Sequence, residues 1–366
     1  MSIVYCIKFD SRKHNIANNI KALLKVAKVN EIINEGDIVA IKVHMGERGN
    51  FRHPRPQIVR AIVDFVKNYG GKPFVTDTTT LYSGYRRDAC EYLETAAING
   101  FTIGSIGAPI IIADGLRGRD YREIKTGGDL GTVTVASAIA EADSMIVLSH
   151  VKFHISFGFG GALKNLAMGC VARKSKFDMH AVSKPTINKE KCTGCGQCVR
   201  HCNWGAISLI DGKATIDYDK CVGCGDCVAI CRFGAARLSW DKSDRLLRLA
   251  AEAAYGVISA FEKGRIFYIN TLTEIVGFCD CATPLESPLV PDIGILGSYD
   301  PVAIDQASMD LINQAPGYLY DGISFKPIAP GTDKSKLLRP DINWEVLLEE
   351  AEHWKIGSRK YKLVPI

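Results

Sequence analysis

The sequence lacks a long apolar run, a basic stripe and an N-terminal targeting segment, and each absence excludes a class of protein. No apolar stretch among its 366 residues approaches the ~20 that cross a bilayer, so we expect no membrane span. The net charge of +5 is mild, and the basic residues form no run typical of nucleic-acid binders. The opening residues, MSIVYCIKFDSRKH, contain no basic region followed by a long apolar one, so no signal peptide is expected. We therefore predict a cytoplasmic protein that binds no nucleic acid.

Thirteen cysteines stand out in an otherwise ordinary composition. With 47% hydrophobic and 23% charged residues, the chain is typical of a globular protein. Its length and the missing signal peptide argue against a secreted disulfide framework. Reduced thiols that bind metal are therefore expected.

Eight of the cysteines lie in an internal repeat. Residues 192–209, CTGCGQCVRHCNWGAISL, and residues 221–238, CVGCGDCVAICRFGAARL, both read C-x-G-C-G-x-C-V-x-x-C-x-x-G-A-x-x-L. Three closely spaced thiolates can hold three irons of a four-iron cubane, and the glycines let the backbone wrap close to the sulfurs. The repeat resembles the bacterial two-cluster ferredoxin module.

In that module the fourth ligand of each cluster comes from the other half. The resemblance implies two [4Fe–4S] clusters, one on Cys192, Cys195, Cys198 and Cys231, and one on Cys221, Cys224, Cys227 and Cys202. The proline that follows each fourth cysteine in the family is replaced here by Asn203 and Arg232, neither position being a ligand. A zinc site is one alternative, although eight cysteines in a strict duplicated pattern favour clusters. Clusters with a purely structural role are another.

The two flanks of the repeat both alternate between predicted strands and helices. Upstream, strands are expected at residues 3–9, 36–44, 72–77, 108–114 and 144–150, and helices at 15–33, 54–70, 87–99 and 135–143. Downstream, helices are expected at 243–264, 300–314 and 342–354, and strands at 265–270 and 292–298. This alternation predicts an α/β fold with a largely parallel sheet and helices on both faces. We expect one host domain, residues 1–185 and 241–366, interrupted by a small α+β ferredoxin-like insertion at residues 186–240.

Polar side chains follow several of the predicted strands, where ligands usually bind in open α/β sheets. The candidates for catalysis are His44, Asp77, His150, His154 and Lys164, and His180 is a further histidine of the same set. Lys164 belongs to GFGGALKN, residues 158–165, whose glycines lead into a predicted helix. The N-terminus of that helix could receive an anionic small molecule, and a simple tight turn is the alternative.

Cys279 and Cys281 lie one residue apart in GFCDCATP, outside the repeat. On an extended strand both thiols would face one site, and a disulfide between them would close a small, strained ring. We expect an additional metal or redox site here, against burial in the core or a polar turn at Asp280. The candidates for further ligands are Cys170, Asp77, His44 and His150.

Several segments together resemble a known family. They are VHMGE, DTTTLY, SHVKFH, GFGGALKNLAMGC, CDC and VPDIGILGSYDPVAIDQA. They are similar to an uncharacterised group of iron–sulfur-centre proteins from anaerobic bacteria and archaea, catalogued as domain of unknown function 362, over most of residues 1–315. The resemblance supports the architecture and the cleft residues, and it implies no particular reaction.

The sequence thus predicts an electron-transfer protein that carries electrons through two [4Fe–4S] clusters to or from a ligand or redox site in the host cleft. Such a protein needs a redox partner protein, and a ferredoxin-coupled oxidoreductase would be its enzymatic form. The alternative is a partner-binding or metal/cluster-maturation module without small-molecule turnover. A non-redox enzyme with structural clusters is a third hypothesis.

Overall fold

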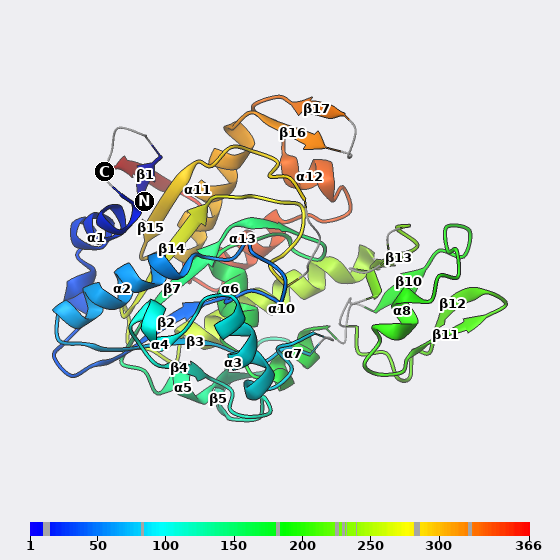
Figure 1. Cartoon of the computed structure of the whole chain (residues 1–366), viewed down its shortest axis with the longest axis horizontal. Coiled ribbons are helices and arrows are strands. Elements are labelled where there is room, and N and C mark those ends of the chain that lie inside the picture. The colour runs from blue at the N-terminus through cyan, green and yellow to red at the C-terminus, as the bar shows by residue number, and fades with distance from the viewer. Residues whose placement is uncertain are drawn as a thin grey trace.

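Eight strands form one large sheet in the order β18-β1-β15-β14-β7-β2-β3-β4 (Figure 1). The computed structural model describes residues 1–9, 15–81, 84–180, 184–223, 227–228, 231, 233–238, 240–281, 286–320 and 324–366. The strands are β1 (Ser2–Lys8), β2 (Ile38–Val43), β3 (Lys72–Asp77), β4 (Ile110–Ile112), β7 (Ser144–His150), β14 (Ile266–Leu272), β15 (Gly294–Ser298) and β18 (Tyr361–Pro365). All neighbours pair in parallel except β15, which runs against both β1 and β14. The predicted, largely parallel α/β sheet is confirmed.

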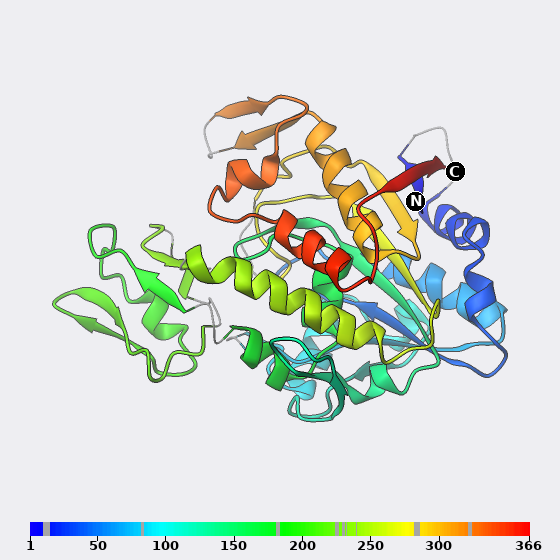
Figure 2. The same ribbon diagram turned by 180° about the vertical axis from the view of Figure 1, so that it is seen from behind.

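Helices cover both faces of the sheet, as predicted (Figures 1 and 2). One core contains residues of α1 (Ile16–Val26), α2 (Pro56–Asn68), α3 (Ala89–Ile98) and α4 (Ile103–Ile106). The other contains residues of α5 (Ser137–Ala140), α6 (Ala162–Gly169), α7 (Arg173–His180), α10 (Trp240–Ile258), α11 (Pro301–Gln314) and α13 (Glu345–His353). Strand β7 places Ile146 and Leu148 in the first core, and Met145 and Val147 in the second. Burial on both faces explains why residues 145–148 of this strand are apolar without alternation.

Several elements were not predicted. The hairpin of β5 (Tyr121–Lys125) and β6 (Thr132–Ala136) is one of them. The end of β6 overlaps the helix expected at residues 135–143, of which only α5 is helical. A second hairpin joins β16 (Gly317–Tyr320) and β17 (Phe325–Ile328), and β18 adds a strand after the last predicted helix. The sequence TVTVA of β6 consists of β-branched residues except for its last residue, and such residues favour a strand. The short elements η1 (Val29–Ile32), α12 (Lys334–Leu338), β8 (Lys152–His154) and β9 (Gly158–Gly160) complete the host part.

The cysteine-rich segment, residues 184–238, lies between α7 and α10 and projects from the side of the sheet (Figures 1 and 2). It contains α8 (Gln197–Arg200) and two small antiparallel sheets, β10 (Pro185–Ile187) with β13 (Ala236–Leu238) and β11 (Ile207–Ile210) with β12 (Lys213–Ile216). Ile207, Ala214, Ile216, Ala235 and Ala236 form a core that is separate from the two cores of the large sheet. Cys224 and Arg232 lie outside the described residues. None of the helices in the described part of the chain is both long and apolar enough to cross a membrane.

Candidate functional site

A cavity of about 160 Å³ opens at the carboxyl ends of the parallel strands β2, β3 and β7. All five predicted catalytic candidates line it, and so do His180 and both cysteines of the CDC segment. The residues are His44, Asp77, His150, His154, Lys164, His180, Cys279 and Cys281. The strand-end rule therefore identified one real cavity from residues up to 237 positions apart.

The candidates chosen from the sequence did not include several polar residues of the same cavity, namely Lys42, Arg86, Lys152, Asn165 and Lys176. A signal existed for Lys42, because a lysine inside the otherwise apolar strand IVAIKV needs a buried partner. Its partner is Asp77, whose Oδ1 lies 2.8 Å from Lys42 Nζ with both side chains almost fully buried. Burial would raise the pKa of Asp77, but the Lys42 ammonium, together with His44 and a hydrogen bond from Tyr92, outweighs burial and lowers that pKa to about 2. Asp77 is thus half of an internal ion pair rather than a free base.

His44 lies beside that pair and contacts Arg86, whose NH1 is 2.9 Å from His44 Nε2. Burial, and then the guanidinium of Arg86, lower the pKa of His44 to about 3, so the imidazole is neutral at pH 7. Arg86 also donates from Nε to Glu47 Oε2 over 3.1 Å, in a buried ion pair. The wall made by β2 and β3 is therefore a fixed polar network.

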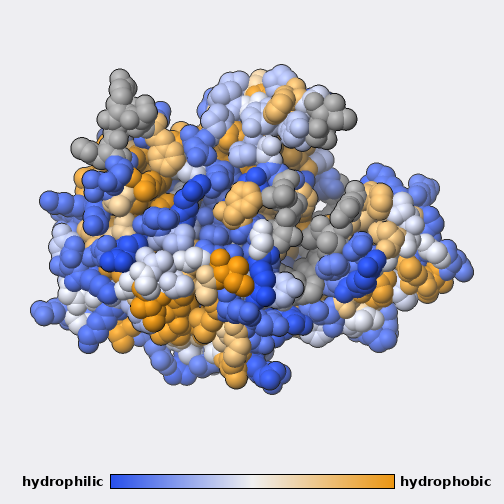
Figure 3. All heavy atoms as spheres, viewed as in Figure 1, coloured by the Kyte–Doolittle hydropathy of each residue, from blue (hydrophilic) through white to orange (hydrophobic). Residues whose placement is uncertain are grey.

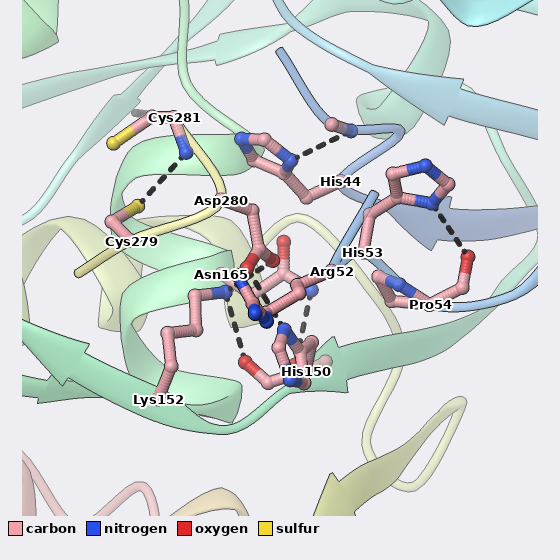
Figure 4. Close-up of polar contacts among 12 residues, drawn as sticks. His44, Arg52, His53, Pro54, His150, Lys152, Asn165, Cys279, Asp280 and Cys281 are labelled. Atoms are coloured by element: carbon pink, nitrogen blue, oxygen red, sulfur yellow. Dashed lines mark hydrogen bonds and ion pairs between the residues drawn. The ribbon is translucent and has the colours of Figure 1, made fainter. Parts of the chain in front are cut away.

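Asp280, the residue between the two cysteines, anchors the CDC segment to β7 (Figure 4). Its Oδ1 lies 2.8 Å from His150 Nδ1, and its Oδ2 accepts a hydrogen bond from Lys152 Nζ, also over 2.8 Å. The other ring nitrogen of His150 lies 2.7 Å from the carbonyl oxygen of Thr273. Burial would raise the pKa of Asp280, but His150 and Lys152 hold it well below its usual range. His150 therefore has both ring nitrogens engaged in holding this loop.

The CDC segment is a turn and not the extended strand that we predicted. The amide of Cys281 donates to Cys279 Sγ over 3.4 Å, which folds the backbone so that both sulfurs come to one side (Figure 4). Lys164 Nζ lies 3.9 Å from the same sulfur. A hydrogen bond from Cys281, reinforced by Lys164 and His154, holds the pKa of Cys279 well below its usual range, whereas that of Cys281 is raised. The lower pKa of the pair therefore belongs to Cys279.

His154, Cys279 and Cys281 form a group that could hold a metal ion, since their ligand atoms lie within 4.8 Å of one another. Cys170, predicted as a third ligand, is not in this group. It is fully buried, its Sγ contacts the carbonyl oxygen of Asn165 at 3.7 Å, and burial raises its pKa to about 12. A thiol buried in this way is a core residue rather than a ligand.

The hydrogen bonds of His154 indicate which of its ring nitrogens carries the proton, and so whether it is ready to ligate a metal. Its Nδ1 accepts hydrogen bonds from the amides of Ser156 and Phe157, over 3.0 and 3.2 Å. Burial lowers its pKa to about 4, so the ring is neutral at pH 7 and carries its single proton on Nε2. A protonated Nε2 donates to a thiolate and would have to give up its proton to ligate a metal. The geometry therefore favours a histidine that supports the Cys279 thiolate.

The N-terminus of α6, the helix that follows the glycine loop, is occupied by a carboxylate of the chain itself. Asp305 accepts hydrogen bonds from the amides of Ala162 and Leu163, over 2.7 and 2.9 Å, at the first turn of α6. A Cβ at Gly161 would lie 2.2 Å from Asp305 Oδ1, so the glycine is needed for this close approach. The prediction that this helix N-terminus receives an anionic small molecule is wrong, because an internal carboxylate occupies it.

In the cysteine-rich segment, a second cavity is lined by Cys192, Cys195 and Cys198 of the first repeat and by Cys231 of the second. Cys202, Cys221 and Cys227 pack with the core of the same segment. Equivalent positions of the two repeats behave alike, since Ala206 donates to Cys202 Sγ and Ala235 donates to Cys231 Sγ, both over 3.3 Å. The cysteines of the described residues form no disulfide.

Comparison with known proteins gives a family and no activity. A family model described as "Domain of unknown function (DUF362)" matches residues 39–310, and no curated protein matches the chain. Among solved structures, the lactate racemase apoprotein from Thermoanaerobacterium thermosaccharolyticum is similar with 11% identity and a TM-score of 0.34, over 75% of this chain and 51% of that one. A structural-genomics protein from Thermotoga maritima is similar with 13% identity and a TM-score of 0.38, over 80% and 57%. The chain spans little more than half of either protein, and similarity at this level assigns no activity.

Proposed function

Because the chain belongs to the DUF362 family, whose description names no activity, we propose its function from its own cysteines and cavity. The proposal is an iron–sulfur electron-transfer protein in which two [4Fe–4S] clusters exchange electrons with a ligand or redox site in the host cavity. The observation that carries it is the cavity of Cys192, Cys195, Cys198 and Cys231, in which three thiols of one repeat meet the last thiol of the other. A two-cluster ferredoxin ligates its clusters in this crossed manner.

The donor set fits such clusters. Backbone amides point at the sulfurs of Cys192, Cys202 and Cys231, each from an alanine 3.3 Å away. Amide hydrogen bonds of this kind stabilise thiolate ligands and tune the potential of an iron–sulfur centre. The second cluster would be held by Cys202, Cys221, Cys227 and Cys224, the last of which lies outside the described residues. When bound, the clusters would supply one-electron transfer.

The domain boundaries belong to the same proposal. The small core of the cysteine-rich segment is separate from the two cores of the sheet. The large sheet takes strands from both sides of the segment in the chain. This arrangement supports a ferredoxin-like insertion, residues 186–240, in a host domain of residues 1–185 and 241–366.

Helix α7 connects the two parts of the proposed electron path. Its residue Phe177 contacts the ring of Trp204 at a centroid distance of 6.5 Å, and Trp204 follows Cys202 by two positions. Three residues further along the same helix, His180 lines the host cavity. The cluster that includes Cys202 would therefore be the one that faces the host, and the other cluster would face outward.

A redox partner protein would dock on the cysteine-rich segment. Trp204, Leu209, Ile210 and Phe233 are large apolar residues of this segment with 38–53% of their surface exposed. Figure 3 shows hydrophobic residues at the surface of this part of the molecule, beside hydrophilic ones. Mixed apolar and polar surface is typical of transient interfaces.

A chelator challenge separates an electron carrier from a module that delivers clusters. The protein is purified without oxygen, reduced with dithionite, reoxidised, and then incubated with excess iron chelator. A resident pair of clusters should return to its original spectrum after each cycle and keep its iron, about eight atoms per chain. Iron that passes to the chelator while the chain stays folded would contradict the proposal and favour the maturation module.

A further inference from the structure

The host cavity has more positive than negative charge. Five cationic side chains line it, namely Lys42, Arg86, Lys152, Lys164 and Lys176. Three of them are paired with the carboxylates of Asp77, Glu47 and Asp280. Among the described residues, neither Lys164 nor Lys176 lies within ion-pair distance of a carboxylate.

In the described part of the chain, the contacts of the two remaining lysines involve no carboxylate. Lys176 is 6% exposed, and its ammonium donates to Thr78 Oγ1 over 2.6 Å and to the carbonyl oxygen of Thr79. Lys164 lies over the ring of Phe157, 5.6 Å from its centroid, and faces Cys279 Sγ. Both ammonium groups act on His180, whose pKa burial lowers to about 4 with help from His154 and from these two lysines. Both charges therefore act on the region of the cavity around His180.

The side chain of Lys176 is buried and that of Lys164 is half-buried, and a bound anion would lower the cost of keeping both charges in the cavity. Lys164 faces Cys279 Sγ, whereas the hydrogen bonds of the Lys176 ammonium go to the neutral oxygens of Thr78 and Thr79, so an added anion would find no carboxylate within ion-pair distance of either lysine among the described residues. An engineered cavity of about 150 Å³ binds benzene, so the 160 Å³ found here admits a molecule of about six nonhydrogen atoms.

We propose that the host cavity binds a small oxyanion-bearing molecule, a short carboxylate or phosphate compound, with its anionic group at Lys164 and Lys176 and its remainder beside Cys279 Sγ. This site differs from the helix N-terminus, which Asp305 already fills. The inference deepens the proposed function, on which it rests for the redox role of the cavity.

Alkylation with two reagents of nearly equal shape tests this site. Iodoacetate carries a carboxylate and iodoacetamide a neutral amide, and each forms a sulfur–carbon bond with release of iodide. On the anaerobic holoprotein, peptide mass spectrometry gives the rate of each reagent at Cys279 and at the exposed thiol Cys90. The ratio of the iodoacetate rate to the iodoacetamide rate should be about tenfold higher at Cys279 than at Cys90, because Lys164 and Lys176, which line the same cavity, attract the carboxylate.

Matched variants assign the effect to the two lysines. Lys164→Met and Lys176→Met should each lower the ratio at Cys279 severalfold. Lys174→Met is the control. Lys174 lies on the same helix as Lys176, α7, but it is exposed and paired with Asp178 over 2.9 Å. Protection of Cys279 from iodoacetamide by added acetate identifies a carboxylate ligand, and protection by inorganic phosphate identifies a phosphate compound.

Equal ratios at Cys279 and Cys90, or a ratio at Cys279 that both Lys164→Met and Lys176→Met leave unchanged, would overturn the inference. The measurement does not depend on the clusters. A chain that loses iron to a chelator yet keeps the high ratio at Cys279 would contradict the proposed function and leave the anion site standing.

Discussion

The double variant Cys192→Ser/Cys231→Ser is expected to lose one cluster and keep the other, with iron falling from about eight to about four atoms per chain. The two cysteines belong to different repeats, 39 positions apart in the sequence, yet they line the same cavity. If both cysteines ligate the same cluster, the first substitution already removes that cluster. The second substitution then leaves the other cluster in place. Iron and sulfide analysis after anaerobic reconstitution gives the answer.

The matched control is Cys192→Ser/Cys202→Ser, in which both substitutions fall within the first repeat. Crossed ligation assigns these two cysteines to different clusters, so this variant should lose both and bind little iron. If each cluster were ligated within one repeat, Cys192→Ser/Cys202→Ser would lose one cluster and Cys192→Ser/Cys231→Ser would lose both. A Cys192→Ser/Cys231→Ser protein with less iron than Cys192→Ser/Cys202→Ser would refute the assignment of Cys231.

Replacement of Lys42 with methionine is expected to destabilise the chain by about 3–5 kcal/mol, because it leaves the buried carboxylate of Asp77 without its counter-charge. The midpoint of urea unfolding, followed by circular dichroism, measures the loss. The exposed pair of Arg60 and Asp64, 2.7 Å apart on α2, supplies the control, and Arg60→Met should cost about 0–1 kcal/mol.

The pH dependence of the stability of Lys42→Met shows whether the lost ion pair or lost packing causes the destabilisation. In the wild type, the folded pKa of Asp77 is about 2, below its ordinary value of 3.8, so its stabilising effect is complete above about pH 4 and is lost as the pH falls towards 2. In Lys42→Met, burial raises that pKa instead, and protonation then relieves the strain on the folded state. The deficit relative to wild type should therefore shrink on acidification, and Lys42→Met/Asp77→Asn should recover part of it at pH 7. A deficit that is constant with pH would mean that lost packing, and not charge, is responsible.

Local patterns in the sequence predicted most of the host architecture. Apolar runs between helical periodicities predicted the strands β2, β3, β7 and β14, and their shared direction placed His44, Asp77 and His150 at one edge of the sheet. The direction of β15 could not be predicted in this way, because its sequence, GILGS, is as apolar as those of the parallel strands of the sheet. Strand direction depends on the path of the connection rather than on the residues of the strand.

The roles within the cavity depend on contacts over long sequence separations. Asp280 looked like a turn residue, whereas its partners His150 and Lys152 are 130 and 128 positions away. Asp305 reaches the start of α6 across 143 positions, and no feature of GFGGALKN indicates that its amides are already occupied. The sequence therefore indicated some of the residues that line the cavity, and only the folded chain shows the others and their contacts.

Electron paramagnetic resonance of the dithionite-reduced protein tests the central claim most directly. The account predicts signals of two reduced [4Fe–4S] clusters per chain, close to two unpaired spins in total, which disappear on reoxidation and return on renewed reduction. A protein that shows no such signal, or that holds zinc in place of iron on these eight cysteines, would contradict it.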